Sequence, residues 1–399
     1  MNPSRLLLAI LMVLTALGEI STQLIIPALG GIERGLGAAH GASLAALSAF
    51  VAAFGVGQLL LGPLSDRVGR RPVLIGGLSL YLAATAWMLL ADDMAGFVLG
   101  RVVQGLGACA ALVLARAIVR DVWKAQAAPA LALTVIGMLS AIALAPMAGG
   151  LLTQVGGWQA PILASLAVGG TALLAVLAFY RESNPSLDPK AGHPATLARD
   201  YLDLLRQPAS RALALTLAGT YGAMFAVVAG SSSVYIGMLG LSSAEYGLAF
   251  GATISGLIAG ALFTQRRILQ LGPQRIVGIG VSLVAAGAAL TVLVHATLGL
   301  SVLGLSLPQA LVTLGGGMLI PASVAGVVMP NAHRAGLAAG LMGFSQMLGA
   351  TLSGLLLGAL QDASAWPMIG VHALFALSAL SLFALMTRKP RDRAVSAAS

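Results

Sequence analysis

Twelve long apolar stretches fill most of this 399-residue chain. A helix that crosses a bilayer needs about 20 mainly apolar residues, because the hydrocarbon core is about 30 Å thick. Inside lipid, each segment has to satisfy its own backbone hydrogen bonds, which favours helices over open strands. The stretches predict spans over residues 6–29, 43–62, 73–91, 95–119, 128–153, 160–180, 211–239, 244–264, 275–297, 300–329, 335–360 and 366–387.

The composition places the chain in the membrane class, since 58% of its residues are hydrophobic and 9% are charged. The spans 211–239 and 300–329 are long, and we expect them to tilt or to break near Gly230 and Gly315–Gly317. The first span is longer than the core of a signal peptide, and no small-residue cleavage site follows it. We therefore expect it to remain as the first helix.

The positive charges predict how the chain crosses the membrane. If twelve spans alternate, 20 of the 22 Lys and Arg residues fall in loops or at span ends on one side, leaving only Arg34 opposite and Arg101 in the interior of a span. Loops rich in Lys and Arg stay in the cytoplasm. Both termini are therefore expected in the cytoplasm, and the net charge of +9 reflects topology and predicts no nucleic-acid partner.

One polar segment divides the chain into related parts. Residues 181–210 contain four prolines and eight charges, and they predict a cytoplasmic linker with a short amphipathic helix near 196–206. Six spans precede it in residues 1–180 and six follow in residues 211–399. The loops 64–73 and 269–276 each contain a glycine and at least one arginine in the corresponding hinge of the two parts. Two related six-span halves predict a transporter with a site near the midplane between them.

The loop between the second and third spans carries the most specific motif. Residues 62–72 read GPLSDRVGRRP, which resembles the signature loop of the major facilitator superfamily. That resemblance implies an all-α membrane protein with 12 transmembrane helices in two six-helix halves. It also implies a charge relay that latches the cytoplasmic side. The residues assigned to this gate are Gly62, Asp66, Arg67, Gly69, Arg70, Arg71 and Asp121.

Two further motifs narrow the resemblance. In the fourth span, one motif runs from Arg101 to Ala108. The fifth span contains Pro146, Gly149 and Gly150, which are similar to the antiporter motif of the superfamily. A proline inside a helix frees a carbonyl and bends the helix, and glycines admit a close neighbour. With residues 26–29, 115–121 and 343–347, these motifs resemble the Bcr/CflA branch of drug:proton antiporters, close to EmrD-like exporters. The resemblance implies the bacterial inner membrane.

Glu19 and Arg101 are the two charges deep in the interiors of the first six spans. Glu19 lies about 20 Å into the core from the cytoplasmic face, and Arg101 about 10 Å from the other face, so a direct pair is allowed. An ionisable group at that depth is a functional-site hypothesis by default. We interpret Glu19 as the proton-coupling and cation-responsive group and Arg101 as its modulator. The alternative is a structural pair that fixes helix packing. Related carriers often have an acid where this chain has Gln23, one turn beyond Glu19.

The substrate cavity is expected to be lined by polar, aromatic and thioether side chains, which give adaptable contacts to lipophilic compounds. His295 and His372 are expected to be bystanders, and Glu245 to begin the eighth span as an N-terminal acid. The candidate lining residues are Gln23, Gln58, Tyr221, Met224, Phe225, Tyr235 and Gln346.

The function predicted is proton-coupled export of small lipophilic drugs, with cations as one candidate class, by a monomer, with protons and the bilayer as its other partners. A same-fold symporter or an exporter of one metabolite stays open, as does a non-transporting sensor. An intramembrane enzyme is disfavoured, because no metalloprotease, serine-hydrolase or ATP-binding motif occurs. We expect neither a cofactor nor a metal. A channel is disfavoured because no ring of selectivity groups is evident.

Overall fold

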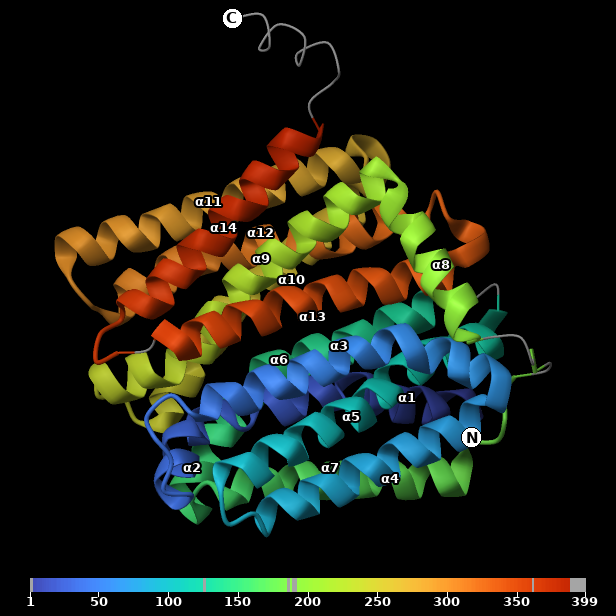
Figure 1. The fold of residues 1–399 in the computed structure, drawn as a ribbon, viewed down its shortest axis with the longest axis horizontal. Helices are drawn as coiled ribbons and strands as arrows, with labels where there is room; N and C mark the ends of the chain where they lie inside the picture. Colours follow the sequence, from blue (N-terminus) through green and yellow to red (C-terminus); the bar gives the residue numbers. More distant parts are fainter. Residues whose placement is uncertain (1–2, 125–126, 185–186, 189–191, 361, 388–399) are drawn as a thin grey trace, which may run out of the picture.

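The computed structural model describes residues 3–124, 127–184, 187–188, 192–360 and 362–387. Throughout these residues the regular structure is helical, and 12 helices are long and apolar enough to cross a membrane. Figure 1 shows the helices of the first part of the chain, in blue to green, beside those of the second part, in yellow to red. The fold class expected from the twelve apolar stretches is confirmed.

The first part contains six spans, and each overlaps its expected range. The differences lie in the residues at which the helices begin and end. The first span is interrupted: α1 ends at Gln23, and a 3-10 turn leads into the short α2. The elements are α1 (Pro3–Gln23), η1 (Ile26–Ala28), α2 (Leu29–Gly35), α3 (Ser43–Val68), α4 (Arg70–Leu89), α5 (Met94–Trp123), α6 (Ala127–Gly156) and α7 (Gln159–Phe179).

The second part begins with the amphipathic linker helix and also contains six spans. The seventh span changes from α-helix to π-helix shortly after Gly230, whereas α12 runs through Gly315–Gly317 without the break that we expected there. The elements are α8 (Pro194–Arg206), α9 (Pro208–Ser232), η3 (Ser233–Met238), α10 (Ser243–Leu271), α11 (Pro273–Leu298), α12 (Val302–Val328), η4 (Ala332–Arg334), α13 (Ala335–Leu360) and α14 (Trp366–Thr387).

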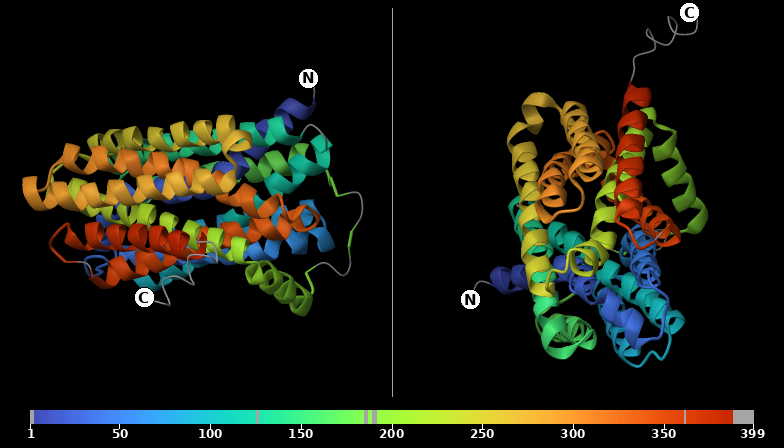
Figure 2. Two further views of the ribbon diagram at one scale, coloured as in Figure 1. Left: turned by 90° about the horizontal axis from the view of Figure 1, so that it is seen from above. Right: turned by 90° about the vertical axis from the view of Figure 1, so that its left-hand side faces the viewer.

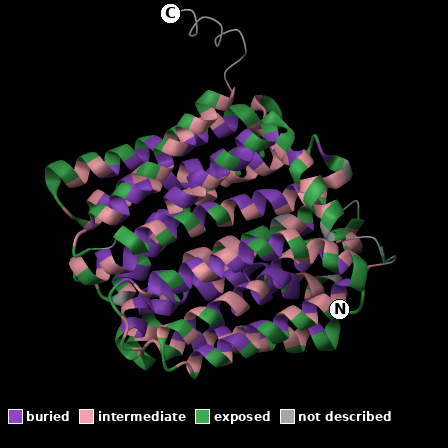
Figure 3. Ribbon diagram, in the orientation of Figure 1, coloured by how far each residue is buried: buried purple, intermediate pink, exposed green. Residues whose placement is uncertain are grey.

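The two six-helix halves meet along two seams, α3 against α13 and α6 against α10. Figure 2 shows the spans running side by side along one direction, with α8 at one end. We call the end that carries α8 and the Gly69 turn the linker end, and the end that carries α2 the far end. Exposed positions are spread over the outward faces of the bundle (Figure 3), and many of them carry large apolar side chains, as expected of a surface that meets lipid.

The halves share more of their core at the far end than at the linker end. One continuous cluster of buried apolar residues joins the first half to far-end residues of the second half, among them Phe225, Tyr246 and Leu357. The linker-end residues of the second half, such as Leu217 and Leu341, form a separate cluster. The apolar packing between the halves is therefore concentrated at the far end.

Glycines allow the helices to approach closely. A Cβ on Gly349 of α13 would overlap the carbonyl oxygen of Ala218 on α9, and one on Gly343 would overlap the Gln58 side chain on α3. Small residues at such contacts are the usual way for helices to pack in lipid, where burial of apolar surface gives little driving force.

We predict that Gly349→Ala lowers the free energy of unfolding by about 1–3 kcal/mol, because the new methyl group forces α9 and α13 apart. Gly370→Ala on α14 is the matched control, because no atom lies within 4 Å of its added Cβ and alanine favours the helix. Thermal unfolding of the purified variants in detergent measures the difference. Equal melting temperatures for the two variants would contradict this packing.

Candidate functional site

Arg101 lies inside the first half and has no carboxylate partner in the described part of the chain. Its side chain is 1% exposed, and the guanidinium carbon lies 4.1 Å from the centre of the Phe50 ring on α3. Nη1 donates to the Gln104 side chain and, at 3.3 Å, to the carbonyl oxygen of Ser21 on α1. Nε and Nη2 find no hydrogen-bond partner among the described residues.

A buried polar network holds Arg101 in place. The Gln104 amide donates to the Thr85 hydroxyl at 2.8 Å, and the Ser21 and Tyr81 hydroxyls lie 2.7 Å apart. The network joins α1, α4 and α5, and the Tyr81 hydroxyl extends it to a carbonyl on α7. Sequence reasoning missed Tyr81 and Thr85, although two polar residues four apart in an apolar span are a signal for such a network.

The direct pair between Glu19 and Arg101, which their depths allowed, is not formed. An α-helix turns by about 200° over two residues, so Glu19 and Ser21 lie on opposite faces of α1. Ser21 contacts Arg101 and Tyr81 inside the first half. Glu19 consequently points away from Arg101, and it has no ion pair in the part of the chain that the structure describes. The depth estimate allowed the pair, but it could not supply the rotation of α1.

Glu19 instead belongs to a cluster between the two halves. It is half-buried, and the Gln23 side chain, one turn further along the same face of α1, interacts with its carboxyl group. The charge of Glu19 also acts on Tyr221 of α9, in the second half. Gln23 is 6% exposed, and its Oε1 has no hydrogen-bond partner among the described residues.

Two other candidate lining residues belong to the interior. On α13, Gly343 packs against α3 and Gly349 against α9, while Leu348 is 41% exposed on the outer side. Gln346 lies about 200° from Leu348 and therefore faces inward, where it stays half-buried. Met224, also half-buried, contacts Gly316 of α12.

The remaining three candidates are engaged in packing. The Gln58 side chain fills the space at Gly343 in the α3–α13 seam, and Phe225 packs at Gly354 in the same region. Tyr235 is 2% exposed, donates to or accepts from Ser306 at 3.0 Å, and lies edge-to-face against Tyr246. In this conformation these side chains line no open surface.

The antiporter-type motif lies where α6 meets both α1 and the other half. A Cβ on Gly149 would overlap the backbone of Leu24, just before η1, and Gly150 is buried beside it. From the second half, Gly247 of α10 fits against the backbone of Pro146 and Met147. α6 is a single helix despite Pro146. The motif thus sets the contact between the halves at the far end.

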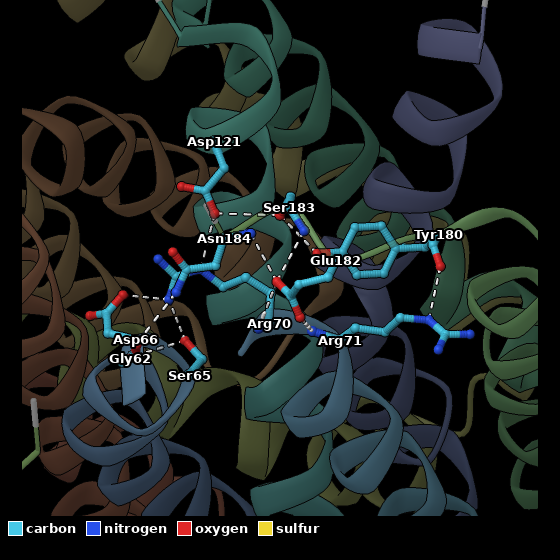
Figure 4. Close-up of polar contacts among 10 residues, drawn as sticks. All are labelled: Gly62, Ser65, Asp66, Arg70, Arg71, Asp121, Tyr180, Glu182, Ser183 and Asn184. Atoms are coloured by element: carbon cyan, nitrogen blue, oxygen red, sulfur yellow. Dashed lines mark hydrogen bonds and ion pairs between the residues drawn. The ribbon is translucent and has the colours of Figure 1, made fainter. Parts of the chain in front are cut away.

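The signature loop forms a charge network at the linker end (Figure 4). The Arg70 side chain, 9% exposed, pairs with Asp66 at 2.5 Å and with Asp121 of α5 at 3.0 Å, and it donates to Ser65. The structure thus brings Asp66, Arg70 and Asp121 together within the first half. Arg67 is exposed, and the Arg71 side chain donates to the carbonyl oxygen of Tyr180 at 3.0 Å.

Glu182 completes this network, and sequence reasoning missed it. Its carboxylate accepts from the backbone N–H groups of Arg70 and Arg71, at 3.1 and 2.8 Å, and so caps the first turn of α4. Partial burial raises the pKa of Glu182, but hydrogen bonds from the N–H groups of Asn184, Arg71, Arg70 and Ser183 outweigh that effect and leave the pKa below its ordinary 4.5.

The two histidines contact residues of neighbouring helices in the second half. His372 is fully buried and its Nδ1 lies 2.8 Å from the carbonyl oxygen of Ala223, whereas His295 packs against Trp366. Glu245 forms a capping box with Ser242, as an acid at the start of α10 was expected to do. Among the described residues, no group of three metal-ligating side chains occurs.

The comparisons with known proteins agree with this architecture. The sequence profile of the Major Facilitator Superfamily matches residues 11–354. The chain belongs to the major facilitator superfamily. Over 348 residues, 86% of each chain, it is 30% identical to multidrug resistance protein D of Escherichia coli K12. It is also 28% identical to a chloramphenicol resistance protein of Pseudomonas aeruginosa, over 88% of this chain and 84% of that one.

Solved structures share the fold at lower identity. The human organic anion transporter MFSD10 (TETRAN) has a TM-score of 0.69 and 21% identity, over 97% of this chain and 99% of that one. The peptide transporter POT has a TM-score of 0.74 and 15% identity, over 95% and 93%. The superfamily resemblance drawn from the signature loop is confirmed. The chain is a membrane transporter of small molecules in the bacterial inner membrane, and not an enzyme.

We predict that Glu182→Gln lowers stability at neutral pH by less than about 1 kcal/mol, because solvent screens this exposed carboxylate. The folded pKa is below the ordinary value, so the contribution of the carboxylate is fully present above pH 4.5 and is lost as the pH falls through the folded pKa. The variant should therefore lose part of the acid sensitivity of the melting temperature. Asp203→Asn, which removes an exposed pair with Arg206, is the control. An unchanged acid profile in Glu182→Gln would contradict the capping role.

Proposed function

We propose that this protein is a proton-coupled exporter of small lipophilic, cationic compounds and works as a monomer by alternating access. The relatives named for multidrug and chloramphenicol resistance support export of foreign compounds. We assign the linker end, with its arginine-rich loops, to the cytoplasm, and both termini with it, following the positive-inside rule.

The position of Glu19 between the halves carries the proposal. A carboxylate at this depth is costly to leave charged without a partner, so it either takes up a proton or pairs with a cation. No basic side chain pairs with Glu19 among the described residues, whereas Tyr221 of the other half lies within its electrostatic reach. A proton and a cationic substrate would therefore compete for the same group, which is the requirement for exchange.

Alternation follows from the two ends of the bundle. The continuous apolar core at the far end, together with the Gly149 and Gly247 contacts, supports a conformation closed toward the outside. We propose that the Arg70 network is the cytoplasmic latch and that its pairs, now within the first half, are regrouped when that side closes. Proton entry from outside then resets the carrier after substrate release.

Arg101 has a separate part in this proposal. It binds the Ser21 carbonyl on the face of α1 opposite to Glu19, so it fixes the position of α1 inside the first half. We propose that it modulates Glu19 by holding the helix that carries the carboxylate, and not by pairing with it. The simpler alternative is that Arg101 only fixes the packing of α1 and has no effect on Glu19.

The test is proton-driven efflux of a fluorescent lipophilic cation from proteoliposomes. We predict that wild type shows efflux that depends on the pH gradient, and that Glu19→Gln loses this dependence because the amide does not titrate. Glu33→Gln is the matched control: Glu33 lies in α2 at the far end and accepts from Gly41 and Ser43, outside the Glu19 cluster.

Gradient-dependent efflux that persists in Glu19→Gln would move the proton site elsewhere. If neither wild type nor Glu33→Gln moves any cationic dye, the exporter assignment is contradicted, and the same-fold alternative, a carrier of one specific metabolite, takes its place.

A further inference from the structure

The amide of Gln23 leaves one buried acceptor unpaired beside Glu19. Gln23 is 6% exposed, and its Oε1 has no hydrogen-bond partner in the part of the chain that the structure describes. A buried polar atom without a partner is destabilising, and buried carbonyl oxygens are paired in the great majority of cases. The oxygen is enclosed and without a partner in this conformation, so a donor that reaches it as the halves rearrange would relieve that cost.

The chemistry of the cluster determines which atom of the Gln23 amide lacks a hydrogen-bond partner. Because Glu19 as a carboxylate only accepts hydrogen bonds, the favourable orientation of the Gln23 amide turns its N–H side toward that group. Turning the amide over would place its oxygen against the carboxylate. The atom of Gln23 that lacks a partner is therefore the oxygen, and the cluster contains acceptors from both residues.

The two acceptors share one face of α1 and are separated by one helical turn, about 6 Å along the axis. Arg101 does not compete for them, because it contacts α1 on the opposite face, at Ser21. On the side of the second half, Tyr221 and Met224 are half-buried and supply an aromatic ring and a thioether. A ligand between them meets two acceptors and an apolar wall.

We propose that the preferred substrates are organic cations that carry at least two N–H donors, such as protonated amines, amidines and aminoaryl dyes. One N–H group pairs with Glu19, a second donates to Oε1 of Gln23, and the apolar body lies against α9. A cation without N–H groups satisfies the charge of Glu19 but leaves Oε1 unpaired. This proposal rests on the proposed function and adds a selectivity that charge and lipophilicity alone do not give.

A pair of rhodamine dyes isolates the hydrogen bond. The methyl ester of unsubstituted rhodamine and tetramethylrhodamine methyl ester carry the same permanent charge on the same ring system, but the second has N-methyl groups in place of every N–H. Binding of both dyes to the purified protein in nanodiscs is measured by fluorescence anisotropy. Proton-driven efflux from proteoliposomes is measured in parallel, with protein-free liposomes correcting for leak.

We expect wild type to bind the N–H dye roughly tenfold more tightly than the methylated dye, as the loss of a buried hydrogen bond implies. Gln23→Met keeps the approximate size of the side chain but has no amide oxygen, and the preference should disappear. Gln309→Met is the matched control, since Gln309 is 5% exposed on α12 in the other half, and the preference should remain.

The outcomes separate the two proposals. Equal affinities for both dyes in wild type, or a preference that survives in Gln23→Met, would overturn the inference, while Glu19-dependent efflux of either dye would leave the proposed function intact. Failure of wild type to bind or move either dye overturns both. If Gln23→Met does not fold, the wild-type dye comparison still decides, because it needs no variant.

Discussion

The rotation of α1 about its own axis is the constraint on which the rest of the site depends. Ser21 and Glu19 are two residues apart, so the helix presents them to opposite sides. One side is sealed into the first half by Arg101, Phe50 and Tyr81. The other side faces α9 across the boundary between the halves. The Arg101 network at Ser21 and the Glu19 cluster are thereby kept apart, although Ser21 and Glu19 are close in the sequence.

This separation explains how a buried guanidinium can persist without an acid. Arg101 is compensated by a ring face, one carbonyl and one amide, which together give less than an ion pair but leave Glu19 free for other partners. If the two charges were paired, the carboxylate would be neutralised permanently and could not respond to a proton or a cation. The geometry thus favours a titratable Glu19 over a structural one.

The same helices are held at their ends by carboxylates from distant parts of the chain. Glu33 accepts from Ser43 at the start of α3, and Glu182 caps α4 from 112 residues downstream. Gly69 is needed there for two reasons: its φ of 108° is unfavourable for other residues, and a Cβ would press on the Glu182 carboxylate. The α3–α4 hairpin is therefore attached to the first half at both ends, and it is suited to move with that half as one body.

The sequence predicted the twelve spans well, because lipid leaves a long apolar segment no alternative to a helix. The contact of Asp66, Arg70 and Asp121 followed from the family resemblance, whereas Glu182 was missed because no local pattern indicates a cap so far along the chain. Depth along the membrane was predictable for Glu19 and Arg101, but an error of one residue rotates a helix face by about 100°. The packing of Tyr235 among other aromatic residues depends on tertiary contacts that hydropathy does not contain.

We propose that the charge of Glu19 determines how the two halves sit relative to each other. Double electron–electron resonance between spin labels measures this directly, with Cys109 replaced by alanine. Val122 and Leu269 are exposed label sites at the linker end, one in each half, and Leu90 and Leu298 serve the far end. We predict that, in the protein that retains Glu19, acidification lengthens the distance at one end and shortens the distance at the other. In Glu19→Gln, both distances should keep at every pH the distribution that the protein with Glu19 shows at acid pH. The same pH-dependent shift in Glu19→Gln, or no shift in the protein that retains Glu19, would contradict the account.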